Sequence, residues 1–178
     1  MAVIDRRSSS DPLPVRIDDA QRVLAVARIA LGFVFLWAFL DKLFGLGIPT
    51  PSGQGWLFGA GDGNPTQGYL SAVDGPFAWL FNPMAGLGWV NWLFMAGLAG
   101  IGIGLMTGLA FRFSAICGCL MLLLIYLADL PPAANPVLDD HIIEILMLVG
   151  LILLRNGRVW GAEAWWDERV GSRVPLLR

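Results

Sequence analysis

The chain contains a single histidine, His141, and three carboxylates lie within three residues of it. On a helix that starts near Leu138, Asp140 and Glu144 are four residues apart and His141 and Glu144 are three apart, so these side chains share one face. Because the ordinary pKa of an imidazole lies near neutrality, His141 beside carboxylates predicts a group that takes up or delivers protons. An apolar run follows, which predicts that the cluster lies at the mouth of a membrane helix, where ionisable groups are costly and commonly functional.

A metal site is one alternative interpretation of these residues. His141, Glu144 and either Asp140 or Asp41 would supply the mixed nitrogen and oxygen ligands that suit zinc, iron or manganese. Proton exchange is the favoured interpretation, so no residue is assigned as a metal ligand. Haem is not expected either, because a single histidine cannot provide a bis-histidine site.

Helix capping is a second alternative, and it needs no chemistry. Asp139 and Asp140 would cap the helix N-terminus, where negative charge is favoured, while His141 and Lys42 would be paired residues at the membrane interface. This interpretation explains Asp139 well and Glu144 less well, because Glu144 lies roughly one turn into the helix.

The composition is that of a membrane protein. Of the 178 residues, 56% are hydrophobic and only 15% are charged, and the mean hydropathy is +0.65. Four apolar stretches can cross a hydrocarbon core about 30 Å thick at about 1.5 Å per residue, namely residues 23–46, 89–111, 113–130 and 137–154. The sequence therefore predicts an all-α fold: a four-helix transmembrane bundle, with residues 1–178 forming one integral membrane domain in a lipid bilayer. Neither a nucleic acid partner nor a bound nucleotide is expected.

Positive charges set the expected orientation. Apart from Lys42 and Arg112, every Lys and Arg lies at a terminus or at the adjoining helix end: Arg6, Arg7, Arg16, Arg22, Arg28, Arg155, Arg158, Arg169, Arg173 and Arg178. Cytoplasmic segments carry an excess of such residues, so the tails 1–22 and 155–178 are both predicted to be cytoplasmic.

The opposite face should carry the candidate chemistry. Residues 44–88 and 131–141 contain no Lys or Arg and are predicted to lie outside. This places the acidic cluster around His141 at the same membrane depth as Asp41 and Lys42, which come from the far end of the first helix.

Two connecting segments have distinct patterns. The long outer loop between the first two helices, residues 47–88, is rich in Gly and Pro but too apolar for a disordered tail. We expect residues 75–84 to lie in the outer interface as a cap over the bundle. The stretch 157–170 mixes tryptophans with charges, which predicts a short amphipathic C-terminal helix on the cytoplasmic surface.

Close helix packing and one buried cation are also predicted. Ala96, Gly100, Gly104 and Gly108 form one four-residue row, and small residues at this spacing let helices approach closely in lipid. Arg28 lies about one and a half turns inside the first helix, where no acid shares its depth. We expect its side chain either to snorkel to the headgroups or to contact backbone carbonyls.

Four short motifs bear on family. They are Arg28-x-x-x-Gly32-x-x-Phe35, Asp41-Lys42-Leu43, Pro131-Pro132 and Asn135-Pro136-x-x-Asp139-Asp140-His141. From about Arg22 to Trp166 the chain resembles the DoxX/DoxD family of small four-helix membrane proteins, and the resemblance is closest to actinobacterial members labelled as a thiosulfate:quinone oxidoreductase subunit. It implies a multi-pass protein of the bacterial inner membrane with partner subunits in a redox complex. The chain would be the membrane subunit of that oxidoreductase, or an anchor for sulfurtransferase and superoxide-detoxifying partners.

The residues and the resemblance together predict quinone contact and proton exchange at the outer face. The quinone would lie between the first and fourth helices beneath the cap. The candidate catalytic residues are His141, Glu144, Lys42, Asp140 and Asp41. The candidate quinone-binding residues are Lys42, His141, Trp37 and Phe44.

Thiosulfate itself suits this surface poorly. The only possible cations on the predicted outer face are Lys42 and His141, against the carboxylates Asp41, Asp62, Asp74, Asp129, Asp139, Asp140 and Glu144. Such a surface repels a dianion unless a partner subunit supplies positive charge. A non-catalytic scaffold that anchors a larger respiratory or oxidative-stress complex is the alternative function. A small-solute or lipid-handling channel is less favoured, because tight glycine packing leaves little room for a pore.

Overall fold

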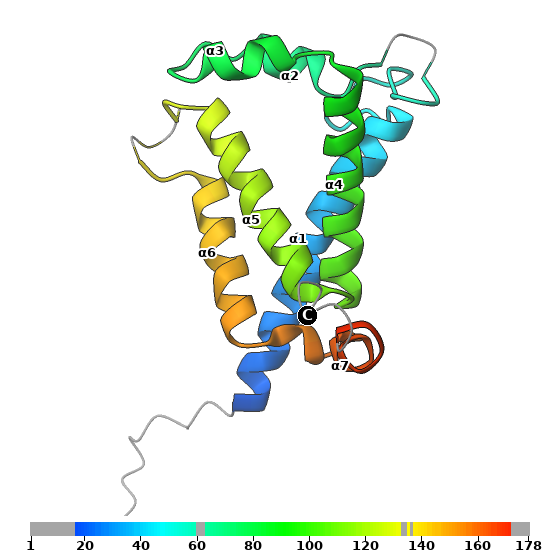
Figure 1. Ribbon diagram of the computed structural model, residues 1–178, viewed down its shortest axis with the longest axis vertical. Helices are drawn as coiled ribbons and strands as arrows, with labels where there is room; N and C mark the ends of the chain where they lie inside the picture. Colours follow the sequence, from blue (N-terminus) through cyan, green and yellow to red (C-terminus); the bar gives the residue numbers. More distant parts are fainter. Residues whose placement is uncertain (1–16, 60–62, 133–134, 136, 172–178) are drawn as a thin grey trace, which may run out of the picture.

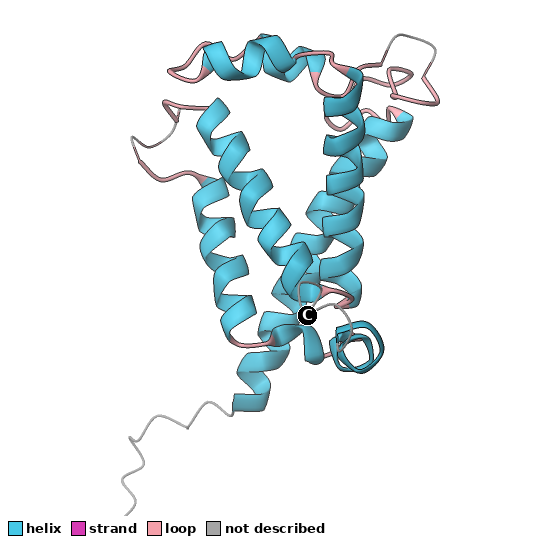
Figure 2. Ribbon diagram, viewed as in Figure 1, coloured by secondary structure: helices cyan, strands magenta, loops and turns pink. Residues whose placement is uncertain are grey.

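The computed structural model describes residues 17–59, 63–132, 135 and 137–171. Over these residues the protein is helical and contains no strand (Figure 2). Three helices are long and apolar enough to cross a membrane: α1, Ile17–Phe44; α4, Gly88–Thr107; and α5, Phe111–Ala128. The prediction of an all-α membrane protein is therefore confirmed.

The helix α6, Asp140–Leu153, is shorter than the apolar run 137–154 that predicts it. The carboxylate of Asp139 caps the helix, so α6 begins three residues later than Val137 and has 14 residues. At about 1.5 Å per residue this is roughly 21 Å, less than a hydrocarbon core of about 30 Å. Leu148 and Leu151 of α6 are nevertheless fully buried in the common core.

The long helices form two pairs (Figure 1). The helix α1 packs mainly against α4, and α6 packs mainly against α5, while α4 and α5 join the pairs through the tight turn at Gly108. All four helices contribute to one apolar core, which contains Phe35 of α1, Met95 of α4, Phe111 of α5 and Leu148 of α6. Figure 1 shows the pairs close together near the α4–α5 turn and diverging toward the other end.

Short helices cross the end where the pairs diverge: α2, Gln67–Ser71; α3, Ala78–Phe81; and η1, Asn82–Met84 (Figure 1). Val73 and Phe81 pack on Ala128 at the end of α5. The Tyr69 hydroxyl donates a hydrogen bond to Oδ1 of Asp129 at 2.6 Å. Within the segment 75–84 expected as a cap, Phe81 is thus tied to α5 by an apolar contact, and the residues just before it add a further apolar contact and a polar one.

The glycine row expected to mediate close packing is confirmed in part. A Cβ atom added to Gly104 would lie 2.6 Å from the Cβ atom of Ser114, so this glycine lets α4 and α5 approach closely. The contact of α4 with α1 uses a different register. A Cβ atom added to Gly102 would lie 2.8 Å from the backbone nitrogen of Leu36 and 3.0 Å from the carbonyl oxygen of Gly32. A Cβ atom on Gly100 would meet nothing within 4 Å. The close approach of α1 and α4 therefore depends on Gly102 and Gly32, because the side chains of α1 set which face of α4 is covered.

The segment after α6 folds back onto the bundle as η2, Asn156–Arg158; α7, Glu163–Trp166; and the π-helical turn η3, Asp167–Gly171. Arg28 is fully buried and donates from Nη1 to the carbonyl of Leu105 at 2.7 Å and from Nη2 to that of Val159 at 2.9 Å. The N–H of Ala162 donates to the carbonyl of Thr107 at 2.8 Å. Of the two expectations for Arg28, contact with backbone carbonyls is confirmed and snorkelling is wrong.

Candidate functional site

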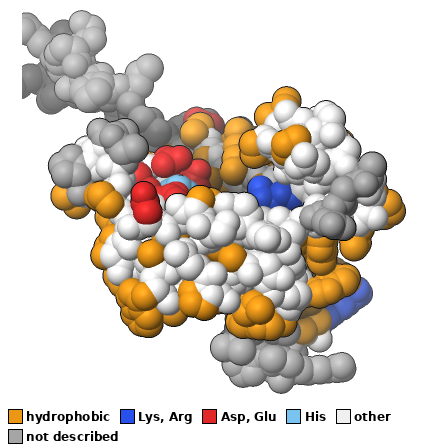
Figure 3. Space-filling model, turned by 90° about the horizontal axis from the view of Figure 1, so that it is seen from above, with side chains coloured by type: hydrophobic (Ala, Val, Ile, Leu, Met, Phe, Trp, Pro, Cys, Tyr) orange, Lys and Arg blue, Asp and Glu red, His pale blue; other side chains and the backbone are white. Residues whose placement is uncertain are grey.

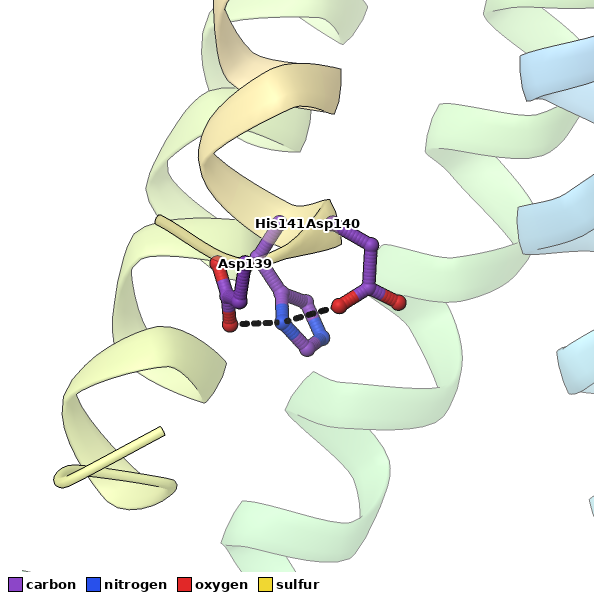
Figure 4. Close-up of side chains that lie close together, drawn as sticks. All are labelled: Asp139, Asp140 and His141. Carbon is purple, nitrogen blue, oxygen red and sulfur yellow. Dashed lines mark hydrogen bonds and ion pairs between the residues drawn. The ribbon is translucent and has the colours of Figure 1, made fainter. Parts of the chain in front are cut away.

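The start of α6 is built around one carboxylate. Oδ1 of Asp139 accepts the backbone N–H of Ile142 at 3.1 Å, which makes Asp139 the N-cap of the helix. Oδ2 of the same side chain lies 2.7 Å from Nδ1 of His141 (Figure 4). One aspartate therefore satisfies a free amide of the helix end and fixes the plane of the imidazole.

The electrostatics of this pair favour an ionised Asp139. Burial alone would raise the pKa of this carboxyl, but the hydrogen bonds from His141 and from the Ile142 amide outweigh it and lower the pKa below its ordinary value. Asp140 differs, because its side chain is 84% exposed and its Oδ1 lies 3.6 Å from Nδ1 of His141. The imidazole is thus held by a shielded carboxylate and has a solvated one beside it.

The same three side chains also offer metal ligands. Asp139, Asp140 and His141 each present a ligand atom, and these atoms lie within 4.8 Å of one another. This set differs from the one considered from sequence, because it contains Asp139 in place of Glu144. Nδ1 of His141 and Oδ2 of Asp139 already bond to each other, so the geometry describes an oriented imidazole better than a closed ligand set.

Glu144 lies one turn further along α6 and is half-buried. It interacts electrostatically with His141, Asp139 and Asp140. Within the described part of the chain, its carboxylate makes no hydrogen bond or close ion pair. Glu144 and Asp140 therefore surround the histidine with negative charge without holding it in place.

The side chain of Asp41 binds backbone amides of the loop that follows α1. It is fully buried, and its two oxygens accept the backbone N–H of Ile48 at 3.1 Å and that of Thr50 at 2.8 Å. The indole of Trp37 donates to the carbonyl of Ile48 at 3.1 Å, and the ring of Phe44 stacks on that of Phe58 with centroids 5.1 Å apart. These candidate residues of α1 hold the loop that follows them.

Lys42 faces a separate pocket of about 720 Å³. The polar side chains that line it with Lys42 are Thr50, Gln54, Asn64, Gln67 and Tyr69. Burial and the neighbouring carboxylate of Asp129 raise the pKa of Tyr69, which keeps its hydroxyl as a donor to Asp129. No carboxylate of the described residues forms an ion pair with Lys42.

The structure does not join the α1 and α6 residues into one bonded site. Seen from the end covered by α2 and α3, the acidic patch around the pale blue histidine and a blue Lys or Arg side chain are separate (Figure 3). This follows from the fold, because α1 packs on α4 and α6 packs on α5. Equal depth in the membrane brings residues to one face of the protein, but only helix pairing brings them into contact.

A charged pocket at the opposite end of the bundle is not predicted from sequence. It has a volume of about 150 Å³ and is lined by Arg112, Arg155, Arg158, Glu163 and Asp167. In the sequence these arginines indicate only the orientation of the chain in the membrane. Their positions are the signal for the pocket, since Arg112 is the second residue of α5 and Arg155 follows the end of α6.

Comparison with known proteins finds no matching protein-family model, no matching curated protein and no matching solved structure.

Proposed function

We propose that this protein is the membrane subunit of a quinone-linked redox complex, in which His141 exchanges a proton with a quinone. The observation that supports this most strongly is the 2.7 Å contact between Asp139 and Nδ1 of His141. It leaves Nε2 of the imidazole without a hydrogen bond to any described residue. A histidine oriented through one nitrogen by a carboxylate is typical of general acid–base sites, because the other nitrogen faces the substrate.

The balance of electrons and protons determines what the partner subunit and Asp140 would contribute. Reduction of a quinone to a quinol consumes two electrons and two protons. A partner subunit with a redox centre would supply the two electrons, and His141, as the imidazolium, would pass one proton from Nε2 to a quinone oxygen. Water would supply the second proton to the other quinone oxygen. The solvated carboxylate of Asp140, 3.6 Å from the ring, would let the imidazole recover its proton from water.

The apolar surface beside His141 supports a substrate that arrives from lipid. Leu138 is exposed three residues before His141. His141 lies on the same face of α6 as the buried Leu148, seven residues further on, so a quinone ring would reach it from the mouth of the helix near Leu138, without crossing to Lys42. We therefore propose a quinone contact on α6 in place of one shared between the first and fourth helices.

The proposal includes α6 as a fourth span and places both termini in the cytoplasm. Exposed Leu146, Val149 and Leu153 on α6 would face lipid, opposite the buried Leu148 and Leu151. A helix of 14 residues can span if the bilayer thins locally. The positive charges near the chain ends support the orientation.

Quinone binding by the full chain in lipid nanodiscs tests the function. His141→Gln should weaken the binding of a short-chain menaquinone about tenfold or more, because a hydrogen bond from a charged donor is worth about that factor. Asp139→Asn should weaken it less and should shift its pH profile, since the imidazole loses its charged partner. Asp18→Asn, an exposed acid at the far end of α1, is the matched control.

Equal menaquinone affinity in the wild type, His141→Gln and Asp139→Asn would contradict the proposal. If intact complexes were then lost on deletion of residues 75–84, with no defect in the remaining enzyme, the scaffold function would be supported in its place.

A further inference from the structure

The pocket at the far end of the bundle lies where three segments meet. Arg112 is the second residue of α5, Arg155 follows α6, and Arg158, Glu163 and Asp167 belong to the folded-back tail. Figure 1 shows the start of α5, the end of α6 and α7 at the same end of the molecule. Because α5 is a candidate span that begins at Phe111, this pocket lies at the level of the lipid headgroups.

The tail that forms one wall of the pocket is held firmly. Arg28 binds the carbonyl of Val159, the N–H of Ala162 binds the carbonyl of Thr107, and Nδ2 of Asn156 donates to the carbonyl of Gln21 at 3.0 Å. These bonds attach the tail to α1 and α4. The charged side chains therefore converge on a preformed space of about 150 Å³.

The charges in the pocket are only partly matched. Arg158 pairs with Asp167 at 3.2 Å and reaches Glu163 only at 3.9 Å. Arg112 and Arg155 make no hydrogen bond or close ion pair with the described residues, although both act electrostatically on Glu163. Two guanidinium groups are thus available to an anion.

The two carboxylates of the pocket, Glu163 and Asp167, each have an oxygen atom that accepts no hydrogen bond. The Glu163 side chain is only 4% exposed, and its Oε2 atom and the Oδ1 atom of Asp167 are buried without a hydrogen bond. Burial and the charge of Asp167 raise the pKa of Glu163. A buried carboxylate without a donor is costly, so a ligand that supplies N–H groups would be stabilised here.

We propose that this pocket binds a phosphate that carries a primary ammonium group, as in the headgroup of phosphatidylethanolamine. The phosphate would bind the guanidinium groups of Arg112 and Arg155, which suit phosphate oxygens in geometry and charge. The ammonium would donate to Glu163 and Asp167. This inference rests on other residues than the quinone proposal and stands independently of it.

The apolar surroundings favour a membrane lipid over a free phosphoamine. Phe113 follows Arg112 on α5, and Leu153 and Leu154 precede Arg155, and all three are exposed. Trp160 and Trp165 of the tail are exposed as well, and tryptophan is enriched at the depth of the headgroups. Acyl chains attached to a headgroup in the pocket would therefore meet apolar surface on the adjoining helices.

The test measures lipid binding to the full chain by native mass spectrometry in detergent, with the lipids added one at a time. Phosphatidylethanolamine should bind about tenfold more tightly than phosphatidylcholine, whose ammonium has no N–H donor, and than phosphatidylglycerol, which has no cation. Glycerophosphoethanolamine, which has the headgroup without acyl chains, should bind more weakly than the lipid.

Variants locate the site. Glu163→Gln should remove the preference for phosphatidylethanolamine over phosphatidylcholine, and Arg155→Gln should weaken both lipids about tenfold. Arg155 is exposed, so this variant should fold even if Glu163→Gln does not. Arg22→Gln is the matched control, because Arg22 is an exposed arginine of α1 outside the pocket.

Each alternative outcome overturns a stated part of the proposal. Equal affinity for the three lipids, unchanged in Arg155→Gln, would overturn the site. Equal affinity for phosphatidylethanolamine and phosphatidylglycerol would overturn the ammonium contact. Glycerophosphoethanolamine binding as tightly as the lipid would overturn the membrane source of the ligand.

Discussion

Asp139 and His141 are joined by a 2.7 Å contact that occupies one carboxylate oxygen, while the other oxygen caps α6 through the Ile142 amide at 3.1 Å. Helix start and imidazole orientation therefore depend on the same side chain. A change that breaks one function of Asp139 affects the other, and substitutions at this position can be chosen to separate them.

Acid should loosen the start of α6. The folded-state pKa of Asp139 is lower than its ordinary value, so its charge stabilises the fold above the ordinary pKa and this stability is lost as the pH falls through the folded pKa. We expect faster hydrogen exchange of the Ile142 amide below about pH 4, after correction for intrinsic rates. Asp139→Asn, which keeps a capping oxygen but has no charge, should show no such step. Asp139→Ala should also lose the cap, at a cost of about 1 kcal/mol. An identical pH response of the Asn variant and the wild type would contradict this account.

Replacing Arg28 should release the tail. Arg28→Met removes the donors to the carbonyls of Leu105 and Val159, and hydrogen bonds from charged groups are worth roughly 1.5 to 3 kcal/mol each. We expect a lower unfolding midpoint in detergent and faster proteolysis after Arg158. Arg28→Lys keeps the charge without the two-branched donor and should be intermediate. Arg22→Met, an exposed change on the same helix, should leave both measurements unaltered. If the tail of Arg28→Met resisted proteolysis as well as the tail of the wild type, the proposed role of Arg28 in holding the tail would be contradicted.

The close packing of α1 and α4 should be sensitive to substitution of Gly102 and insensitive to substitution of Gly100. Gly102→Ala would place a methyl group 2.8 Å from the Leu36 nitrogen, and overpacking of this kind costs about 1 to 3 kcal/mol. Gly100→Ala meets nothing within 4 Å and should be neutral or slightly stabilising, since alanine favours helix. Equilibrium unfolding of both variants in mixed detergent checks the difference. Equal effects of the two substitutions would show that the register of the helix pair is different.

Asp41 should be needed for the loop after α1. Asp41→Asn keeps one acceptor oxygen for the two amides of Ile48 and Thr50, so one N–H is left without a partner, at a cost of about 1 to 3 kcal/mol. The indole N–H resonance of Trp37 reports the change, because it donates to the carbonyl of Ile48. We expect this resonance to shift and to exchange faster with water. Asp74→Asn, a change at an exposed acid in the connection between α1 and α4, should leave the resonance in place.

The sequence predicts well the features that depend on residues close to one another in the chain. Long apolar runs predict α1, α4 and α5 because length and hydropathy are local properties. The capping role of Asp139 was predictable for the same reason, since the amide it accepts lies three residues away.

The features that sequence leaves open depend on distant partners. The carbonyl of Val159 lies 131 residues from Arg28, so nothing near Arg28 selects it over a headgroup. Gly102 and Gly100 look alike in sequence, and only the packed face of α1 distinguishes them. Asp41 and Lys42 are expected from sequence to match His141 in depth, but the pairing of α1 with α4 and of α5 with α6 decides their contacts.

The Arg28 contacts also bear on how the chain is made. Arg28 enters the membrane with the first helix, yet its acceptors are carbonyls in α4 and in the tail near Val159. During synthesis this cation must wait for most of the polypeptide before its last acceptor emerges from the ribosome. The hydrogen bonds of Arg28 are therefore complete only after the segment around Val159 has been made and has folded back onto the bundle.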